Sequence, residues 1–126
     1  MNTISLKLDN GQQDYRPGDK LAGTTTWEDE KPRRVEIRLF WFTMGVAPRQ
    51  VGLVEQMIID RPRLQNSSNF AFVLPPGPYS FIGRKIGLSW AVEIVLLPSK
   101  RHAAACFNLG PVGQPVFLIS DDAANL

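Results

Sequence analysis

The residues of this chain that could do chemistry are few: one histidine, one cysteine and a pair of acidic residues near the end. His102 follows two cationic residues, Cys106 lies a few positions further on, and Asp121 and Asp122 are adjacent. A catalytic triad needs a histidine that is positioned by a carboxylate and faces a nucleophile. No GxSxG turn or comparable motif accompanies His102, so we expect it to be a solvated loop residue.

The same residues do not predict a metal or cofactor site. Zinc takes three or four protein ligands, which one histidine and one cysteine cannot supply. The two aspartates lack the spacing of a calcium loop, and the sequence has no glycine-rich phosphate-binding loop. Cys106 alternates with small and aromatic residues, so we expect a buried, unreactive thiol. We therefore expect no metal, no cofactor and no enzyme; an enzyme of unrecognised type would need a pocket that joins His102 to a carboxylate.

The charged residues argue against one class of partner and leave another open. A formal net charge of +2 does not imply binding to nucleic acid. Aromatic residues also do not interleave with the basic ones, as they do in proteins that stack on single strands. The basic residues gather at predicted loops: Lys31, Arg33 and Arg34, then Arg84 and Lys85, then Lys100 and Arg101. We expect solvated charge there, and the alternative is contact with an anionic partner or a membrane surface.

Length and hydropathy place the chain among soluble domains. With 126 residues we expect one domain, long enough to form a core without disulfides or metal. One cysteine cannot form an internal disulfide. The N-terminal residues lack the apolar core of a signal peptide, and the apolar run at 91–97 is too short to span a bilayer. We therefore expect a cytoplasmic protein with no integral membrane segment.

The pattern of turns and short apolar runs predicts an all-β fold. Ten glycines and ten prolines recur between the runs, which is typical of a sandwich or barrel. Strands are predicted at 4–8, 20–27, 34–44, 51–59, 70–74, 86–97 and 103–109. We expect an antiparallel immunoglobulin-like β-sandwich of about seven to eight strands. From about residue 111 we expect a C-terminal arm or tail, in which 114–120 forms an edge strand or an arm.

Two motifs in order add a family resemblance. The first reads YRPGDKLAG at 15–23, and the second reads FAFVLPPGPYSFIG at 70–83, followed by a strand of the form IxLxWxV. This order is similar to the N-terminal half of arrestin-domain proteins, over roughly residues 4 to 109. The matching residues are Tyr15, Pro17, Gly18, Leu21, Gly23, Phe70, Phe72, Leu74, Pro75, Pro78, Ser80, Phe81, Gly83, Ile86, Trp90 and Val92.

The resemblance implies a fold and a broad class of function. From their chemistry, the motif residues are expected to pack: Gly18 and Gly23 permit turn or bulge geometry, and Pro75 and Pro78 end a strand. We expect Phe72 to anchor the corner in the core, and Phe81 likewise. The chain carries one arrestin-like half and no counterpart of the interdomain machinery, so receptor binding is not carried over. The resemblance implies a non-catalytic adaptor or scaffold with a protein partner, acting through sheet edges or loops, and able to self-associate into a homo-oligomer.

The strand at 34–44 holds the candidate interface. Its alternation predicts that Val35, Ile37, Leu39 and Trp41 face the core. Phe40, Phe42 and Met44 then face outward, and exposed aromatic residues with methionine are typical of an interface. The alternatives are cover by a loop or by the C-terminal segment PVFLI, or a bulge after Phe40 that slips the register. Within that segment, Val116 and Phe117 are candidates to pair with a sheet edge in the same chain or in a neighbour.

A second hypothesis for the function is a sandwich that binds a small ligand or a carbohydrate. It requires a tryptophan exposed beside polar groups in a concave face. The candidates are Trp27, Trp41 and Trp90, and burial of all three would exclude this hypothesis.

Overall fold

The computed structural model confirms the all-β prediction. It describes residues 4–28, 31–45, 48–62, 65–111 and the backbone of 116–117. The seven longer strands are β1 (Ile4–Leu8), β3 (Lys20–Trp27), β4 (Arg34–Met44), β5 (Val51–Asp60), β6 (Ser67–Val73), β8 (Gly87–Leu97) and β9 (His102–Leu109). Three two-residue strands accompany them, β2 (Asp14–Tyr15), β7 (Phe81–Ile82) and β10 (Val116–Phe117), with a 3₁₀ turn at Asp9–Gly11. No helix in these ranges is long and apolar enough to cross a membrane.

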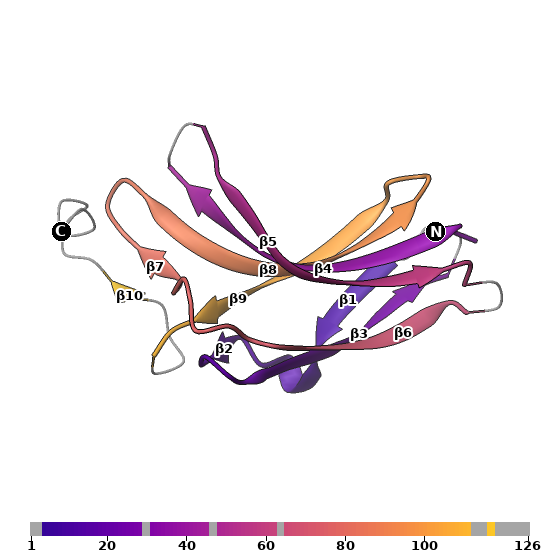
Figure 1. Ribbon diagram of the computed structural model, residues 1–126, viewed down its shortest axis with the longest axis horizontal. Coiled ribbons are helices and arrows are strands. Elements are labelled where there is room, and N and C mark those ends of the chain that lie inside the picture. The colour runs from indigo at the N-terminus through magenta and orange to yellow at the C-terminus, as the bar shows by residue number, and fades with distance from the viewer. Residues whose placement is uncertain (1–3, 29–30, 46–47, 63–64, 112–115, 118–126) are drawn as a thin grey trace.

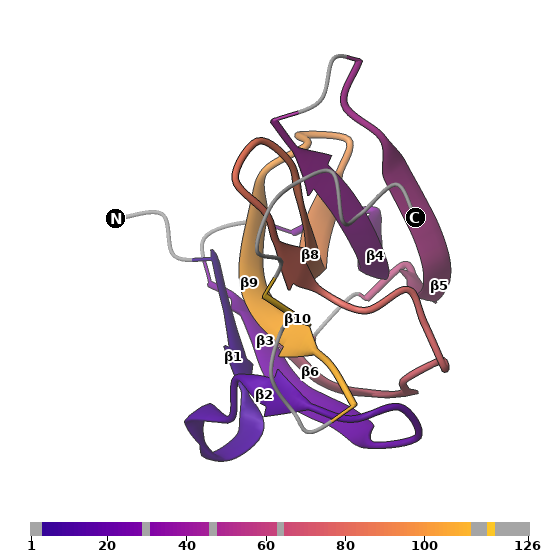
Figure 2. The ribbon, with the colours of Figure 1, turned by 90° about the vertical axis from the view of Figure 1, so that its left-hand side faces the viewer.

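The strands form two sheets that face each other (Figure 1). The first sheet has the order β1-β3-β6, and both of its pairings are antiparallel. In the second sheet β5 pairs with β4 and β4 with β8, while β9 and β7 both pair with the other side of β8, all antiparallel. The short strands add two parallel pairs, β2 with β9 and β10 with β7. Figure 2 shows β5 at the outer edge of the second sheet.

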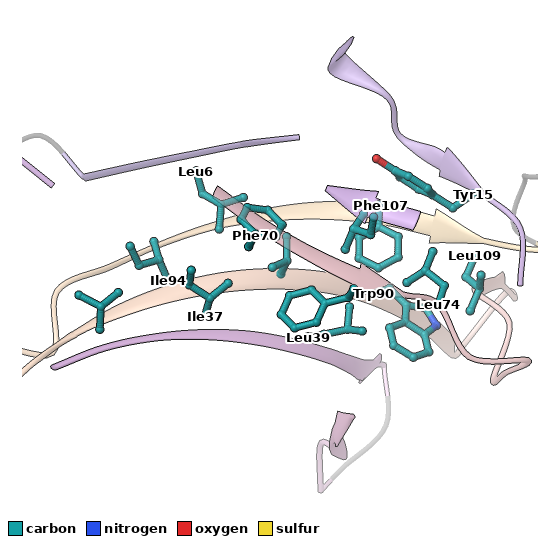
Figure 3. Close-up of a cluster of buried hydrophobic side chains, with 14 of the residues drawn as sticks. Leu6, Tyr15, Ile37, Leu39, Phe70, Leu74, Trp90, Ile94, Phe107 and Leu109 are labelled. Atoms are coloured by element: carbon teal, nitrogen blue, oxygen red, sulfur yellow. The ribbon is translucent and has the colours of Figure 1, made fainter. Parts of the chain in front are cut away.

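Alternation along the strands puts one apolar face of each sheet into a shared core. In β4, Val35, Ile37 and Leu39 are fully buried, as predicted. The same phase continues in β8, whose residues Leu88, Trp90, Val92, Ile94 and Leu96 are buried. Figure 3 shows Ile37, Leu39, Trp90 and Ile94 of these two strands in one cluster with Leu6, Phe70 and Phe107 from other strands. Burial of this apolar area is the main force that holds the two sheets together.

The two sequence motifs meet in space at one corner of the sandwich. Gly18 has a φ of +85° in the turn after Tyr15, a conformation that glycine adopts without strain. Its N–H donates to the Leu74 carbonyl at 2.9 Å, and the Leu74 N–H donates to the Asp19 carbonyl at 2.9 Å. Leu74 is buried, and β6 ends just before it. The first motif therefore anchors the chain just after β6, inside the second motif, through paired backbone hydrogen bonds.

The second motif also connects to the last long strand. The Ser80 N–H donates to the Leu109 carbonyl at 2.7 Å, and the Leu109 N–H donates to Ser80 Oγ at 3.0 Å. Trp90 Nε1 donates to the Pro78 carbonyl at 2.7 Å. Phe72 is buried as expected, while Phe81 is partly exposed but packs against the core. These contacts give the motif residues a structural role, the role expected from their chemistry.

Gly23 departs from its expected role in a turn or bulge. It lies inside β3 in regular register, opposite Leu8 and Phe70. A Cβ atom there would clash with the Lys7 carbonyl oxygen and with the Phe70 ring. Glycine is needed at this position because the ring lies directly over the backbone.

Two further expectations are corrected. Cys106 is exposed, because Phe107 and Leu109 occupy the inward positions of β9 and the neighbouring residues point outward. The strand expected at 70–74 begins earlier, at Ser67, because the polar residues Ser67–Asn69 continue the backbone ladder with Thr24–Thr26. The ladder depends on backbone groups, and an apolar pattern does not reveal its polar end.

Candidate functional site

The residues Phe40, Phe42 and Met44 face away from the core, as predicted. Phe40 and Phe42 are partly exposed, and 45% of Met44 is exposed. The two phenyl rings lie side by side, with their centroids 6.0 Å apart. Directly across the sheet, Leu53 of β5 is opposite Phe40, and Val51 is opposite Phe42. Residues opposite each other in a ladder point to the same face. The apolar surface formed by Phe40 and Phe42 therefore extends onto β5 through Leu53 and Val51.

These side chains define an apolar outer patch, made of Phe40, Phe42, Met44, Val51, Leu53 and Ile82. Val51 and Leu53 are 60% and 56% exposed, and Ile82 of β7 is 49% exposed. Ile82 and Met44 both pair with Gly87 across the sheet, which places them at the same end of the same face. Soluble proteins rarely leave large side chains exposed together without a function for them.

A register irregularity occurs, but it does not turn the aromatic residues inward. The pairing of β4 with β5 shifts between Leu39 and Phe40, so that Leu39 faces Glu55 and Phe40 faces Leu53. Val54 is therefore the extra residue, and it lies on β5. The pairing of β4 with β8 is continuous from Arg34 to Met44. The alternation of β4 is thus preserved, in contrast to the alternative of a slipped register.

The other end of the same face is charged. Glu36, only 8% exposed, pairs with Arg34 (Nε–Oε2 3.0 Å) and with Arg38 (Nη2–Oε1 2.5 Å). Arg38 Nη1 also lies 3.8 Å from Oε1 of Glu93 on β8. Two of these ion pairs join residues two positions apart on β4, and the third reaches across to β8, so both carboxylates, of Glu36 and Glu93, lie beside an arginine.

The rim of the apolar outer patch is basic. The guanidinium of Arg49 lies over the Phe42 ring, 4.6 Å from its centroid, a cation–π arrangement. The β7–β8 loop adds Arg84 and Lys85, both exposed. This loop packs on Gly45 (φ +77°), where a Cβ would clash with the Lys85 carbonyl oxygen. Figure 1 shows the β7–β8 loop beside the ends of β4 and β5, opposite the β8–β9 turn.

The C-terminal candidates pair within the chain. Val116 aligns with Phe81 and Phe117 with Ile82, in a parallel pair beside β7. Pairing was expected with a sheet edge either in the same chain or in a neighbouring chain, and the structure shows pairing within the same chain. The rest of the PVFLI segment, which the sequence offered as one possible cover of the patch, lies outside the described residues.

The tryptophans give little support to a ligand-binding face. Trp27 and Trp90 are fully buried, and each indole N–H donates to a backbone carbonyl, of Gln65 and of Pro78 respectively. Trp41 points to the core side as predicted but is only partly buried. Its ring lies on Gly52 of β5, where a Cβ would clash with it. Only Trp41 keeps any exposure for the second hypothesis.

The residues considered for catalysis are not brought into a reactive arrangement. His102 begins β9 at the surface, and its Nδ1 lies 3.4 Å from the Lys100 carbonyl. Cys106 is exposed on the same strand. Among the described residues no group of three histidine, cysteine or acidic side chains could hold a metal ion. Asp121 and Asp122 lie outside these residues.

The basic groups expected in loops behave in two ways. Arg34 begins β4 and pairs with Glu36, so it belongs to the sheet face and not to a loop. Lys31 and Arg33 lie beside Asp60 and Arg61 in a shallow surface depression.

Sequence reasoning identified the β4 half of the patch and missed its partners on other strands. Val51 and Leu53 follow from the β4–β5 hairpin, since a turn closing at 45–50 places them opposite Phe42 and Phe40. Ile82 and Arg49 had no comparable signal, because their positions depend on how separate strands and loops come together.

Comparisons with known proteins identify no family. No family model and no curated protein matches the sequence. A superoxide reductase (neelaredoxin) from Ignicoccus hospitalis has a TM-score of 0.49 and 9% identity, covering 86% of this chain and 80% of that chain. A variant of the same protein has a TM-score of 0.45 and 10% identity, with coverages of 86% and 82%. A beta-glucosidase from Listeria innocua in complex with isofagomine has a TM-score of 0.47 and 14% identity, covering 91% of this chain and 17% of that chain. Similarity at this level carries no argument about function, and the arrestin resemblance rests on the sequence motifs.

Proposed function

We propose that this protein is a non-catalytic, cytoplasmic adaptor or scaffold that binds another protein through the apolar outer patch. The observation that carries the proposal is the row of Phe40 and Phe42 on β4 beside Val51 and Leu53 on β5, all turned away from the core. The arrestin resemblance supports the same class of function, because it implies a binding module built on a sandwich.

The energetics favour a binding role for these side chains. Each fully buried large apolar side chain contributes about 1.5–3 kcal/mol through the hydrophobic effect. Val51 and Leu53 gain little of this in the isolated chain, because more than half of each remains exposed. A partner that covers them recovers that free energy. Aromatic residues at the centre of such a patch are typical anchors of protein interfaces.

The free edge of β5 supports the proposal as well. In the described part of the chain β5 pairs only with β4, over its whole length from Val51 to Asp60. Such an edge offers backbone donors and acceptors to an added strand. Its apolar residues adjoin the patch, so one partner could use both.

Site-specific photo-crosslinking in the source cell tests the proposal. A photoreactive phenylalanine analogue replaces Leu53 in the patch or, as the matched control, Thr26 on the outer face of the other sheet. We expect a discrete protein adduct from position 53 that is absent from position 26 and is lost when Phe42→Asp is added. Equal adducts at both positions, or none at position 53, would contradict the proposal.

A further inference from the structure

We infer that the partner presents an acidic segment that carries bulky apolar side chains, and that it is not a second copy of this chain. This inference rests on the proposed function and names the chemistry of the partner at the apolar outer patch. It is carried by the distribution of charge around that patch.

The segments that build the patch contain basic residues and no acidic ones. Residues 39–54 include Arg49, and residues 79–92 include Arg84 and Lys85, yet neither segment contains an aspartate or a glutamate. The next residue of β5, Glu55, is exposed, but it is opposite the inward-facing Leu39 and therefore belongs to the other face. The net charge of the whole chain is only +2, so three positive charges at one end of one face are a local excess.

The nearest carboxylates on this face are already paired. Glu36 is held by Arg34 and Arg38, and Glu93 lies beside Arg38. These carboxylates belong to the charged half of the face, toward the far ends of β4 and β8. They do not neutralise the rim formed by Arg49, Arg84 and Lys85.

The rim charges are placed to contact whatever covers the patch. Arg49 lies over Phe42 at 4.6 Å from the ring centroid, and the loop of Arg84 and Lys85 packs against Gly45, directly after Met44. Complementary charge at the rim of an apolar interface raises the association rate and selects the partner. A partner with apolar side chains for the patch and carboxylates for the rim matches both features.

Two other occupants fit less well. A symmetric dimer through the patch would bring each basic rim close to its own copy, since a two-fold interface pairs identical surfaces, and like charges then oppose assembly. An anionic membrane would satisfy the rim but would not use the free backbone edge of β5 next to Leu53. An extended acidic peptide satisfies the patch, the rim and the edge together.

Selection from a random dodecapeptide display library tests the inference. The wild-type protein is the bait, and the Phe42→Asp variant removes peptides that bind elsewhere. We expect the enriched peptides to contain bulky apolar residues together with aspartate or glutamate. Synthetic versions of these peptides then provide probes for fluorescence anisotropy.

Two matched charge reversals measure the contribution of the rim. Arg84→Glu combined with Lys85→Glu should weaken binding of the selected peptides by about tenfold or more, since rim charges steer and select partners. Lys7→Glu combined with Lys20→Glu makes the same charge change on the other sheet, where both lysines are exposed, and should change affinity by less than about twofold. Thermal unfolding confirms that each variant is folded.

The possible outcomes separate this inference from the proposed function. Phe42-dependent peptides that are apolar but not acidic would overturn the inference and leave the proposed function standing. The absence of any Phe42-dependent peptide would contradict both. Phe42-dependent sedimentation with phosphatidylserine vesicles but not with phosphatidylcholine vesicles would assign the patch to a membrane. A concentration-dependent dimer lost in Phe42→Asp would assign it to a second copy. Either of these last two results would overturn the inference.

Discussion

The outer faces of the two sheets differ in the kind of side chain that they expose to solvent. On the first sheet the outward positions of β3 are Lys20, Ala22, Thr24 and Thr26. The two threonines form side-chain hydrogen bonds to neighbouring strands: Thr26 Oγ1 lies 2.5 Å from Ser5 Oγ of β1, and Thr24 Oγ1 donates to Asn69 Oδ1 of β6 at 3.0 Å. The outward side chains of this face are mostly small or polar; the exception is Val73 of β6, opposite Lys20, which is 69% exposed.

The outer face of the second sheet is built differently at one end. Its outward positions at that end carry Phe40 and Phe42 on β4 and Val51 and Leu53 on β5. Both faces belong to the same small sandwich and cover the same core, so folding alone does not require the difference. The contrast fits the proposal that the apolar outer patch binds a partner. The threonine face, which is the outer face of β1, β3 and β6 around Thr24 and Thr26, serves as the reference surface without that proposed role.

The largest expected effect is on the free energy of unfolding, and it distinguishes an aromatic residue of the core from one of the patch. Phe70 is 3% exposed in the core of the first sheet, and Phe70→Ala should lower the free energy of unfolding by about 3–5 kcal/mol. Phe42→Ala should lower it by no more than about 1 kcal/mol, because Phe42 is already partly exposed. Urea unfolding followed by tryptophan fluorescence measures both. Equal losses would mean that Phe42 is a core residue and would remove the contrast between the faces.

The two strand glycines should respond unequally to alanine. Gly23→Ala, in the sheet beneath the threonine face, places a Cβ against the fixed Lys7 carbonyl and the Phe70 ring, and should cost about 3 kcal/mol. Gly52→Ala places a Cβ against the Trp41 ring, which is a partly exposed side chain and can move more easily than backbone, and should cost about 1 kcal/mol. Thermal unfolding of the two variants provides the comparison. A smaller loss of stability for Gly23→Ala than for Gly52→Ala would contradict the expectation that the backbone contact at Gly23 is the harder one to relieve.

The charged half of the outer face of the second sheet should contribute modestly to the free energy of unfolding. Glu36→Gln removes a carboxylate that two arginines share, and should cost about 1 kcal/mol, since both arginines remain partly solvated. The control is Glu93→Gln, whose carboxylate is 3.8 Å from Arg38 and should contribute less than about 0.5 kcal/mol. Urea unfolding at low salt and at 1 M salt measures both effects. A loss for Glu93→Gln as large as that for Glu36→Gln would show that the face is not organised around Glu36.

The smallest effect at neutral pH concerns Tyr15, which lies where the two sheets join. Burial, assisted by the nearby charges of Asp9 and Asp19, raises the pKa of Tyr15 above its ordinary value of 10.0. Stability from the neutral phenol is fully present below pH 10, where both states hold the proton. It is lost as the pH rises above 10 toward the folded-state pKa, because the unfolded chain ionises first.

The check on Tyr15 is the pH dependence of unfolding. Tyr15→Phe should flatten the loss of stability between pH 9 and pH 11. Identical slopes in wild type and Tyr15→Phe would contradict the assignment.

The sequence predicted the local elements well and the relations between them less well. The bounds of β3 and β4 follow from alternation and turn residues, and the outward positions of Phe40, Phe42 and Met44 follow from the phase of one strand. Cys106 could have been placed correctly by the same reasoning, because Phe107 and Leu109 fix the inward phase of β9.

Other features depend on pairing between distant segments. The role of Gly23 requires knowing that Phe70 lies opposite it, and the basic rim requires knowing that the β7–β8 loop packs on Gly45. Periodicity in a single segment carries no information about such contacts, which are set by tertiary packing. The sequence therefore predicts the part of the apolar outer patch that lies on β4, and it does not predict the residues that other strands and loops add.

The most direct test uses the partner that is captured by photo-crosslinking through position 53. The purified partner is titrated with each of three proteins, and calorimetry gives the dissociation constant of each complex. The three proteins are the wild type, Phe42→Asp in the patch and Thr24→Asp on the threonine face, which introduce the same charge. The account predicts at least about 30-fold weaker binding for Phe42→Asp, the loss of a typical interface anchor, and less than about twofold change for Thr24→Asp. Equal weakening by the two variants, or none by Phe42→Asp, would contradict it.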